Sequence, residues 1–286
     1  MQRFSEYSVI KSLIGIVELG RPVDGVVIGS AVILGMFVSS TTLLPADKYV
    51  SGFLMGFILL AAMDTFNDYK DREVDKISKP QRPIPRGLPP RLALFTAVLE
   101  TLVGLLIALL LGLVVVAIVF IAIFIAIAYS KWLKPYFLMK NVVVAIGLSM
   151  AMIAGVFISS GSLTGEVSFL LVLIFIVAFC FEIHKDLGDI VGDSSHGIRT
   201  IPVVLGVKRT VIIIIAGYTL SWLLTCFFFI LKVQEVLYAV VLILTALAGF
   251  YVVYLFYEDP LKYLERSRRV VTATIGILIL AIISLY

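Results

Sequence analysis

The sequence has 286 residues, 61% of them hydrophobic and 15% charged, with a mean hydropathy of +1.11 and a net charge of +4. This apolar content exceeds what the core of a soluble protein of this length can bury, so the composition excludes a soluble enzyme and predicts an integral membrane protein. The positive net charge indicates no nucleic-acid partner, because the orientation of membrane helices already explains where the basic residues lie.

Apolar stretches of about 20 residues, the length that crosses a hydrocarbon core of roughly 30 Å, recur along most of the chain. Before them, residues 1–22 lack an apolar stretch with a cleavage site, so we expect no removable signal peptide but a short amphipathic segment on the membrane. The stretches predict about nine membrane-spanning helices, with the weakest boundary at Gly112 and an even number of crossings as the alternative. The expected spans are 22–43, 48–66, 91–111, 113–131, 140–160, 166–186, 207–231, 235–257 and 270–286.

The basic residues predict how these helices are oriented. If the N-terminus is cytoplasmic, Lys48 and Lys232 are the only Lys or Arg residues that fall on the opposite side of the membrane. Membrane proteins show this bias toward positive charge on the cytoplasmic side. We therefore expect a multi-pass protein of the cell membrane whose larger loops, with any site on them, face the cytoplasm.

Two sets of four carboxylates occur at the ends of apolar stretches that are long enough to span the membrane. Within each set the spacing is 4, 3 and 4 residues, which places all four side chains on one stripe of a helix that continues out of the membrane. The second set repeats the first at an offset of 118 residues. The first set is Asp64, Asp68, Asp71 and Asp75, and the second is Glu182, Asp186, Asp189 and Asp193.

The sequences that follow the two acidic sets also match. "RPIP" at residues 82–85 corresponds to "RTIP" at residues 199–202. Four expected crossings separate the copies, so a parallel internal repeat would place both on the same face of the membrane. We expect a single transmembrane domain over residues 1–286, with a first acidic motif at 64–87 and a second at 182–206.

Four carboxylates on one stripe repel one another, and near hydrocarbon they need a compensating cation. Oxygen ligands without clustered His or Cys suit Mg²⁺, which keeps part of its water and shares its coordination with substrate phosphates. The motifs therefore predict a site that holds a phosphate or diphosphate through Mg²⁺. Arg82 and Arg199 follow the two acidic helices and could donate to the remaining phosphate oxygens, with Lys70, Arg72 and Lys185 nearby.

Polar and small residues outside the motifs have plainer interpretations. His184 has no His or Cys partner at ligand spacing, so we do not expect it to bind a metal. Glu100 lies near the middle of an expected span, where it either forms a hydrogen bond inside the bundle or lines an acceptor pocket. Four glycines are expected to permit close contact between helices: Gly104, Gly147, Gly155 and Gly249.

"NDYKDREVD" at residues 67–75 resembles the NDxxDxxxD motif of the UbiA superfamily of intramembrane prenyltransferases, and "DIVGD" at 189–193 resembles its DxxxD motif. The likeness covers the whole chain and includes "RPIPRG", "YSKWLK" and "GIRTIPVVLG". It implies an all-α membrane fold with the helices around a central cavity. It also implies Mg²⁺-dependent transfer of an isoprenyl group from a polyprenyl diphosphate to a lipophilic acceptor within the membrane.

The resemblance implies a role for individual residues of the motifs. Five residues match positions that hold Mg²⁺: Asn67, Asp71, Asp75, Asp189 and Asp193. Five more would support the metal and bind the diphosphate: Arg82, Arg199, Lys185, Asp68 and Asp186. The residues expected to carry catalysis are Asp71 and Asp189, with Tyr129 and Lys131 of "YSKWLK" in positions near the diphosphate.

Two positions depart from the family pattern, and the acceptor stays open. Asp24 stands where many members have Asn, and Phe181 precedes Glu182 where many have Arg, so one phosphate contact is missing or comes from elsewhere. The motifs resemble those of the archaeal ether-lipid and chlorophyll branches, which slightly favours geranylgeranylglyceryl phosphate as the acceptor. The alternatives are 4-hydroxybenzoate or another quinone or chlorophyll precursor. In a different class, an ion or phosphate transporter would place its carboxylates near the midplane rather than at one face.

Overall fold

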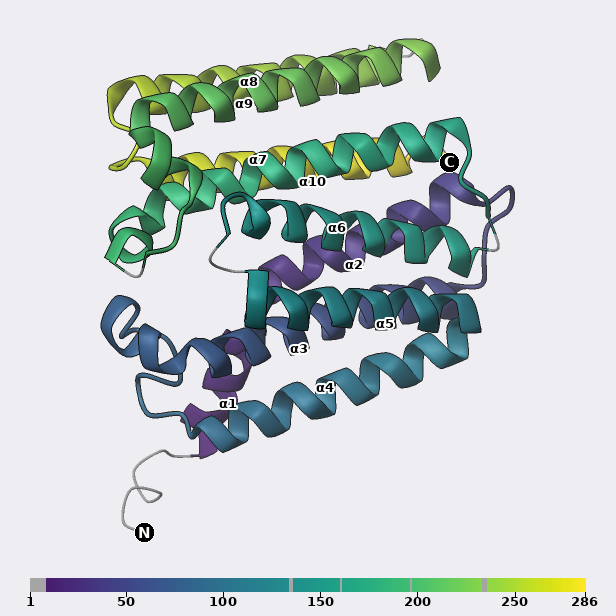
Figure 1. Cartoon of the computed structure of the whole chain (residues 1–286). Helices are drawn as coiled ribbons and strands as arrows, with labels where there is room; N and C mark the ends of the chain where they lie inside the picture. Colours follow the sequence, from purple (N-terminus) through teal and green to yellow (C-terminus); the bar gives the residue numbers. More distant parts are fainter. Residues whose placement is uncertain (1–8, 134–135, 160, 196, 233–235) are drawn as a thin grey trace. The chain divides into compact units, whose positions relative to one another are not determined.

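The computed structural model describes residues 9–133, 136–159, 161–195, 197–232 and 236–286, and within these ranges every regular element is a helix (Figure 1). The side chains of Ser78 and Lys232 are not described. The elements are α1 (Val9–Leu19), α2 (Pro22–Ser39), α3 (Ala46–Ser78), α4 (Pro90–Leu111), α5 (Leu113–Ala128), the π-helical turn η1 (Tyr129–Leu133), α6 (Met139–Ile158), α7 (Gly165–Ser195), α8 (Ile201–Lys232), α9 (Val236–Glu258) and α10 (Leu264–Ile283).

The nine helices α2 to α10 correspond one to one to the nine expected spans, and α1 lies in the expected amphipathic segment. Eight of them, α2 to α9, are long and apolar enough to cross a membrane. The helix α10 is not among these eight, since its first turns carry the charges of "ERSRR". The all-helical membrane fold is therefore confirmed, with the number of crossings approximate. The expected ends at residues 160 and 235 lie outside the described residues.

Two glycines set helix boundaries that the sequence suggested. Gly112 has a φ of 137°, a conformation that L side chains rarely adopt, and it ends α4 and begins α5. The predicted turn at Gly112 is therefore confirmed. Gly206 has a φ of 78° and interrupts α8 after its first residues, so the long apolar part of α8 begins at residue 207, where the span was expected.

The chain forms two compact units, and each is described by itself. Unit 1 comprises the described residues up to Ser130 together with those of Met150–Ser162. Unit 2 comprises the described residues of Lys131–Ser149 and of Leu163–Tyr286. The helix α6 thus contributes its second half to unit 1 and its first half to unit 2. Each unit holds one of the two acidic motifs.

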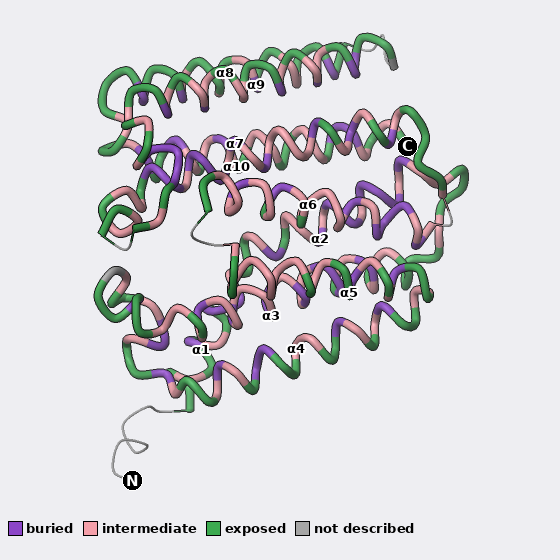
Figure 2. The backbone as a smooth tube through the Cα atoms, in the orientation of Figure 1, coloured by how far each residue is buried: buried purple, intermediate pink, exposed green. Residues whose placement is uncertain are grey.

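In unit 1, α3 packs against both α2 and α4, and buried side chains of five helices form its core (Figure 2). The second half of α6 approaches α2 closely at two glycines. A Cβ atom on Gly35 would overlap the backbone of Met152, and one on Gly155 would overlap the backbone of Val32. A Cβ atom on Gly104 would overlap Leu59, so the predicted close contacts at Gly104 and Gly155 are confirmed.

The same prediction is wrong for Gly147 and Gly249. Among the described residues, no atom would lie within 4 Å of a Cβ atom added to either glycine. Within the part of each unit that the structure describes, no neighbouring helix therefore makes a close contact at either glycine.

In unit 2, a core of buried residues joins α7, α8, α9 and α10. A polar cluster lies inside it: His184 of α7 is fully buried, with Nε2 2.9 Å from Ser267 Oγ of α10 and Nδ1 3.3 Å from Tyr218 Oη of α8. Phe256 of α9 packs edge-on against the His184 ring. His184 therefore connects α7 to α8, α9 and α10.

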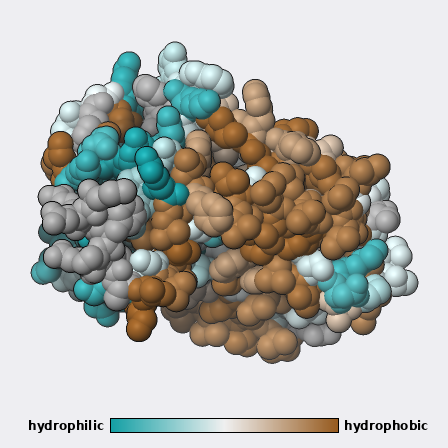
Figure 3. All heavy atoms as spheres, turned by 90° about the horizontal axis from the view of Figure 1, so that it is seen from below, coloured by the Kyte–Doolittle hydropathy of each residue, from teal (hydrophilic) through white to brown (hydrophobic). Residues whose placement is uncertain are grey.

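Large apolar side chains cover much of the outer surface. Leu110 of α4 is 86% exposed, and Phe250 of α9 is 73% exposed. On the face where α4 lies, hydrophobic residues form one broad area with hydrophilic residues gathered to its sides (Figure 3). Exposed Leu and Phe at this density are typical of helix faces that contact lipid.

Candidate functional site

The four carboxylates of the first acidic motif lie on the last turns of α3, whose 33 residues exceed the length that a membrane crossing needs. Its first two carboxylates share one guanidinium. Arg21 donates from Nη1 to Asp64 Oδ1 and from Nη2 to Asp68 Oδ1, each at 2.7 Å. Such charge-assisted pairs neutralise the inner half of the acidic stripe.

The backbone of Arg21 is strained where it makes this contact. Arg21 lies between α1 and α2, directly before Pro22, and has a φ of 43° in the left-handed region. That conformation costs a residue with a side chain roughly 1–2 kcal/mol. In this backbone conformation, the side chain of Arg21 extends from the start of α2 to α3.

A second arginine reaches the motif from the loop after α3. Arg82 Nη1 donates to Asp68 Oδ1 at 2.9 Å and to Asp75 Oδ2 at 2.6 Å. Asp68 and Asp75 are both buried. The predicted phosphate ligand Arg82 and the predicted metal ligand Asp75 therefore contact each other in this structure.

The loop that carries Arg82 is ordered by its own backbone and by apolar anchors. The amide of Lys79 bonds to Asp75 O at 2.9 Å, and the amide of Arg82 bonds to Lys79 O at 3.0 Å. Ile84 and Leu88 are buried against Leu19 and Ala93. The segment "RPIPRG" thus folds back onto α1 and α4, which brings Arg82 to α3.

The outer polar residues of the first motif lie on the same stripe. Asn67 donates from Nδ2 to Asp71 Oδ2 at 3.2 Å, and Ser130 Oγ lies 3.4 Å from Asn67 Oδ1. Ser130 belongs to η1, so the segment "YSKWLK" reaches the first motif through this residue. Tyr129, the first residue of η1, is partly buried.

The four carboxylates of the second acidic motif lie on the last turns of the 31-residue helix α7. Its inner carboxylates, Glu182 and Asp186, are buried and paired with the start of α6. Lys140 Nζ lies 2.5 Å from Asp186 Oδ1 and 3.5 Å from Glu182 Oε1, and Asn141 donates to Asp186 Oδ2 at 2.8 Å. Lys185 also pairs with Glu182, at 3.2 Å.

The outer carboxylates Asp189 and Asp193 are partly exposed on the final turns of α7. Arg199, in the segment between α7 and α8, is exposed. Thr200 and Ile201 next to it are buried, and Ile201 packs with Ile183 and Leu187 of α7. Ile201 corresponds to Ile84 of the first motif, so the buried anchor after the acidic helix is repeated in both units.

The remaining predicted residues lie as follows. Lys131 is exposed and its Nζ is 5.8 Å from the centre of the Trp132 ring. Lys70 is exposed, and Arg72 donates to Tyr69 O at 2.8 Å, so neither contacts a motif carboxylate in a hydrogen bond that the structure describes. Glu100 is partly buried in α4.

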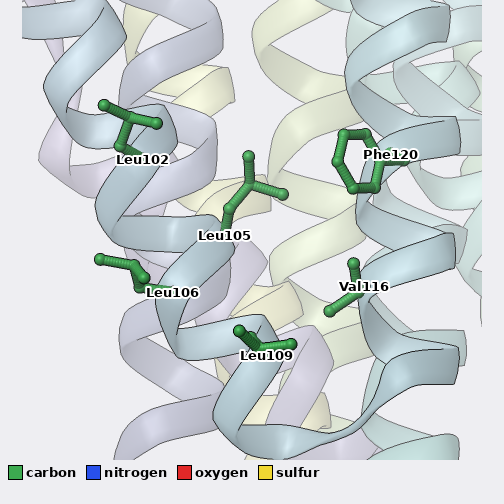
Figure 4. Close-up of a pocket in the computed structure, with 6 residues that line it drawn as sticks. All are labelled: Leu102, Leu105, Leu106, Leu109, Val116 and Phe120. Carbon is green, nitrogen blue, oxygen red and sulfur yellow. The ribbon is translucent and has the colours of Figure 1, made fainter.

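An apolar groove in unit 1 does not contain the acidic residues. It has a volume of about 220 Å³ and lies between α4 and α5, lined by Leu102, Leu105, Leu106, Leu109, Val116 and Phe120 (Figure 4). Because its lining is entirely apolar, this groove cannot bind a phosphate.

Sequence reasoning missed three residues that the structure adds to the motifs. Lys140 and Asn141 contact Asp186, and Ser130 contacts Asn67. Lys140 and Asn141 lie at the start of α6 and Ser130 lies in η1, so the spacing of the acidic motifs does not single them out. The structure also adds Arg21, which pairs with Asp64 and Asp68.

Comparison with known proteins gives a consistent result over most of the chain. The sequence profile of the UbiA prenyltransferase family matches residues 28–282. A digeranylgeranylglyceryl phosphate synthase of Pyrococcus horikoshii is 38% identical over 199 residues, which cover 69% of this chain and 71% of the relative. The corresponding protein of Pyrococcus abyssi is 31% identical over 198 residues, with the same coverage.

Solved structures share the fold at lower identity. An apo UbiA homologue from Aeropyrum pernix has a TM-score of 0.76 at 19% identity, covering 93% of this chain and 98% of that one. A UbiA homologue from Archaeoglobus fulgidus, bound to DMAPP and Mg²⁺, has a TM-score of 0.69 at 19% identity, covering 95% and 99%. The chain is thus an integral, multi-pass membrane protein that belongs to the UbiA prenyltransferase family.

Proposed function

We propose that this chain transfers an isoprenyl group from a polyprenyl diphosphate to a lipophilic acceptor within the membrane, with Mg²⁺ as its cofactor. The observation that carries the proposal is the repeated acidic helix end. In both α3 and α7 the inner two carboxylates are paired with cations, and three of the four, Asp68, Glu182 and Asp186, are buried, while further carboxylates follow on the next turns of the same stripe. This arrangement does not support a transporter, which would place its carboxylates near the midplane of the membrane.

The oxygen ligands of the motifs fit Mg²⁺. Among the described residues, no three His, Cys, Asp or Glu side chains converge on one point, so the structure offers no closed cage. Mg²⁺ is commonly held by one or two carboxylates, with water and phosphate oxygens in its other positions. The residues proposed to hold it are Asn67, Asp71 and Asp75 in unit 1 and Asp189 and Asp193 in unit 2.

In the proposed reaction, different residues of the chain would have different roles. When bound, Mg²⁺ would supply positive charge against the negative charge that grows on the leaving diphosphate. Arg82, Arg199 and Lys185 would donate to diphosphate oxygens, and Arg82 would exchange part of its contact with Asp75 for one with the diphosphate. Tyr129 and Lys131 would lie near the diphosphate, and apolar helices would exclude water from the allylic cation.

The proposed acceptor is geranylgeranylglyceryl phosphate. Support comes from the named relatives, which are digeranylgeranylglyceryl phosphate synthases at up to 38% identity. A phosphate-bearing acceptor needs cations beyond those that bind the diphosphate, and the first turns of α10 carry Arg266, Arg268 and Arg269. An aromatic acceptor such as 4-hydroxybenzoate is the alternative.

The two units would act as a single domain, because each contributes only one of the two motifs that the reaction needs. The distribution of Lys and Arg supports a cytoplasmic location for both motifs. The orientation can be tested with single cysteines placed at Lys70 and Lys48 in a variant without Cys180 and Cys226. In sealed cells, a membrane-impermeant thiol reagent should label the cysteine at 48 and not the one at 70, and the reverse pattern would contradict the orientation.

The function is tested with purified protein in lipid, Mg²⁺ and radiolabelled geranylgeranyl diphosphate. Geranylgeranylglyceryl phosphate and 4-hydroxybenzoate are offered in parallel to the wild type, Asp71→Ala, Asp189→Ala and the control Glu73→Ala. Glu73 lies on α3 between two motif residues, but it is exposed and pairs with Lys76 and Arg72.

We expect Mg²⁺-dependent product with geranylgeranylglyceryl phosphate from the wild type and the Glu73 variant, and none from the two aspartate variants. Product with 4-hydroxybenzoate alone would contradict the proposed acceptor. Failure of the folded wild type to bind or consume any prenyl diphosphate with Mg²⁺ would contradict the proposed reaction itself.

A further inference from the structure

Each acidic motif has its inner carboxylates paired with a cation from the helix that precedes it in the repeat. In unit 1, Arg21 at the start of α2 contacts Asp64 and Asp68. In unit 2, Lys140 at the start of α6 contacts Glu182 and Asp186. The same arrangement thus occurs twice, with different cations.

The positions of the two cations follow the internal repeat. Lys140 lies 119 residues after Arg21, and the carboxylates that they contact are 118 residues apart. The helices α2 and α6 are therefore counterparts, as α3 and α7 are. The contact of Lys140 is not an isolated surface pair but the second copy of a structural arrangement.

The burial of these groups shows what Lys140 contributes. The side chain of Asp186 is 0% exposed and that of Glu182 is 5% exposed, while Lys140 is 23% exposed. Two buried carboxylates this close together require positive charge, and Lys140 and Lys185 supply one charge each. Asn141 donates a hydrogen bond to the second carboxylate oxygen of Asp186.

We propose that Lys140 is a positioning residue of the second motif, and this inference rests on the proposed function. Lys140 would act in two ways through Asp186. Because Asp186, Asp189 and Asp193 lie on one stripe of α7, fixing Asp186 against α6 fixes the rotation of the turn that carries the outer carboxylates. Lys140 would also neutralise the inner carboxylates, Glu182 and Asp186. A cation that binds to the motif would then be attracted mainly to the outer carboxylates, Asp189 and Asp193.

The test compares Lys140→Met, Lys140→Arg, Asp186→Asn and the double variant Lys140→Met with Asp186→Asn. Met keeps the length of the side chain and removes its charge. Lys76→Met is the matched control, since Lys76 is exposed and pairs with the exposed Glu73 in the last turns of α3. Each protein is measured for its thermal unfolding midpoint without Mg²⁺ or donor, and then for kcat and donor KM well below that midpoint.

In the unfolding experiment, Lys140→Met should lower the midpoint by several degrees, because it leaves two buried carboxylates with one cation. The double variant should lower the midpoint by less than the two single variants do when their effects are added, and Lys76→Met should not change the midpoint. Additive losses in the double variant would contradict the direct pairing. This experiment needs no catalysis, so its result stands even if the proposed function fails.

In the kinetic experiment, folded Lys140→Met should lose at least about 10-fold in kcat, with a smaller change in donor KM, as expected for misplaced catalytic groups. Lys140→Arg should restore most of the rate because it restores the charge. A folded Lys140→Met protein with wild-type kcat would show that Lys140 serves stability alone and would overturn the positioning role.

Discussion

Arg82 and Asp75 form a direct ion pair, with Arg82 Nη1 2.6 Å from Asp75 Oδ2 at the end of the first acidic motif. The arginine belongs to the loop after α3, and the carboxylate belongs to α3 itself. Because one group is proposed to bind diphosphate and the other to hold Mg²⁺, the pair links the two halves of the proposed substrate complex. In the proposed reaction, Arg82 would neutralise Asp68 and Asp75 until phosphate oxygens compete for its guanidinium.

Replacement of Arg82 should therefore lower both the rate of prenyl transfer and the stability of the protein. We expect Arg82→Ala to lower kcat/KM for the donor by roughly 100-fold or more, because a charge-assisted contact in the reacting complex is lost. Arg82→Lys should recover only part of the rate, since a lysine keeps the charge but lacks the guanidinium nitrogens for a bidentate contact with phosphate oxygens. Steady-state kinetics with varied donor concentration measures this.

Arg86 provides the control for the Arg82 variants. It lies on the same loop, but it is exposed and pairs with Glu18 of α1. Arg86→Ala should leave kcat/KM close to that of the wild type. An equal loss in both alanine variants would mean that the loop as a whole matters and not the Arg82 guanidinium.

The glycines give a stability prediction with an internal control. Gly155→Ala should destabilise unit 1 by about 1–3 kcal/mol, since its methyl group would overlap the backbone of Val32. Gly249→Ala in α9 meets no described atom within 4 Å and should be neutral or stabilising by up to about 1 kcal/mol. Thermal unfolding in one detergent measures both, and equal effects would contradict the described helix contact.

The polar cluster around His184 gives a third prediction. His184→Leu should destabilise the protein by about 1–3 kcal/mol, because the buried Tyr218 hydroxyl loses its contact at 3.3 Å and the bond to Ser267 is also lost. The Mg²⁺ concentration that gives half-maximal transfer should stay unchanged in the folded variant. A large shift in that concentration would show that His184 acts on the metal site after all.

Much of the fold could be predicted from local patterns. Hydropathy located the nine long helices, and the break at Gly112 followed from a residue that tolerates a positive φ. The 4, 3, 4 spacing of the carboxylates placed each motif on one face of a helix, and α3 and α7 carry them there. These features depend on residues that lie within a few helical turns of one another in the chain, so a single sequence is enough to predict them.

The pairing of the charges could not be predicted in the same way. Lys140 and Asp186 are 46 residues apart, and Arg21 and Asp68 are 47 apart, so their contact depends on how helices pack. Nothing in the local sequence distinguishes Lys140 from a lysine placed by the positive-inside bias. The errors at Gly147 and Gly249 have the same origin, because a small residue permits a close contact but does not create one.

The most direct test of the account measures the rate of prenyl transfer against Mg²⁺ concentration for the wild type, Asp71→Asn, Asp189→Asn and Glu73→Gln. Asn keeps the size of Asp and removes its charge, so the helices α3 and α7 should stay folded, which the thermal midpoint reports. We predict Mg²⁺-dependent transfer by the wild type and the Glu73 variant. Loss by at least about 100-fold is expected in either aspartate variant, because the proposed reaction needs the motif of each unit. Wild-type rates in a folded Asp71→Asn or Asp189→Asn protein would contradict the role of the repeated acidic motifs.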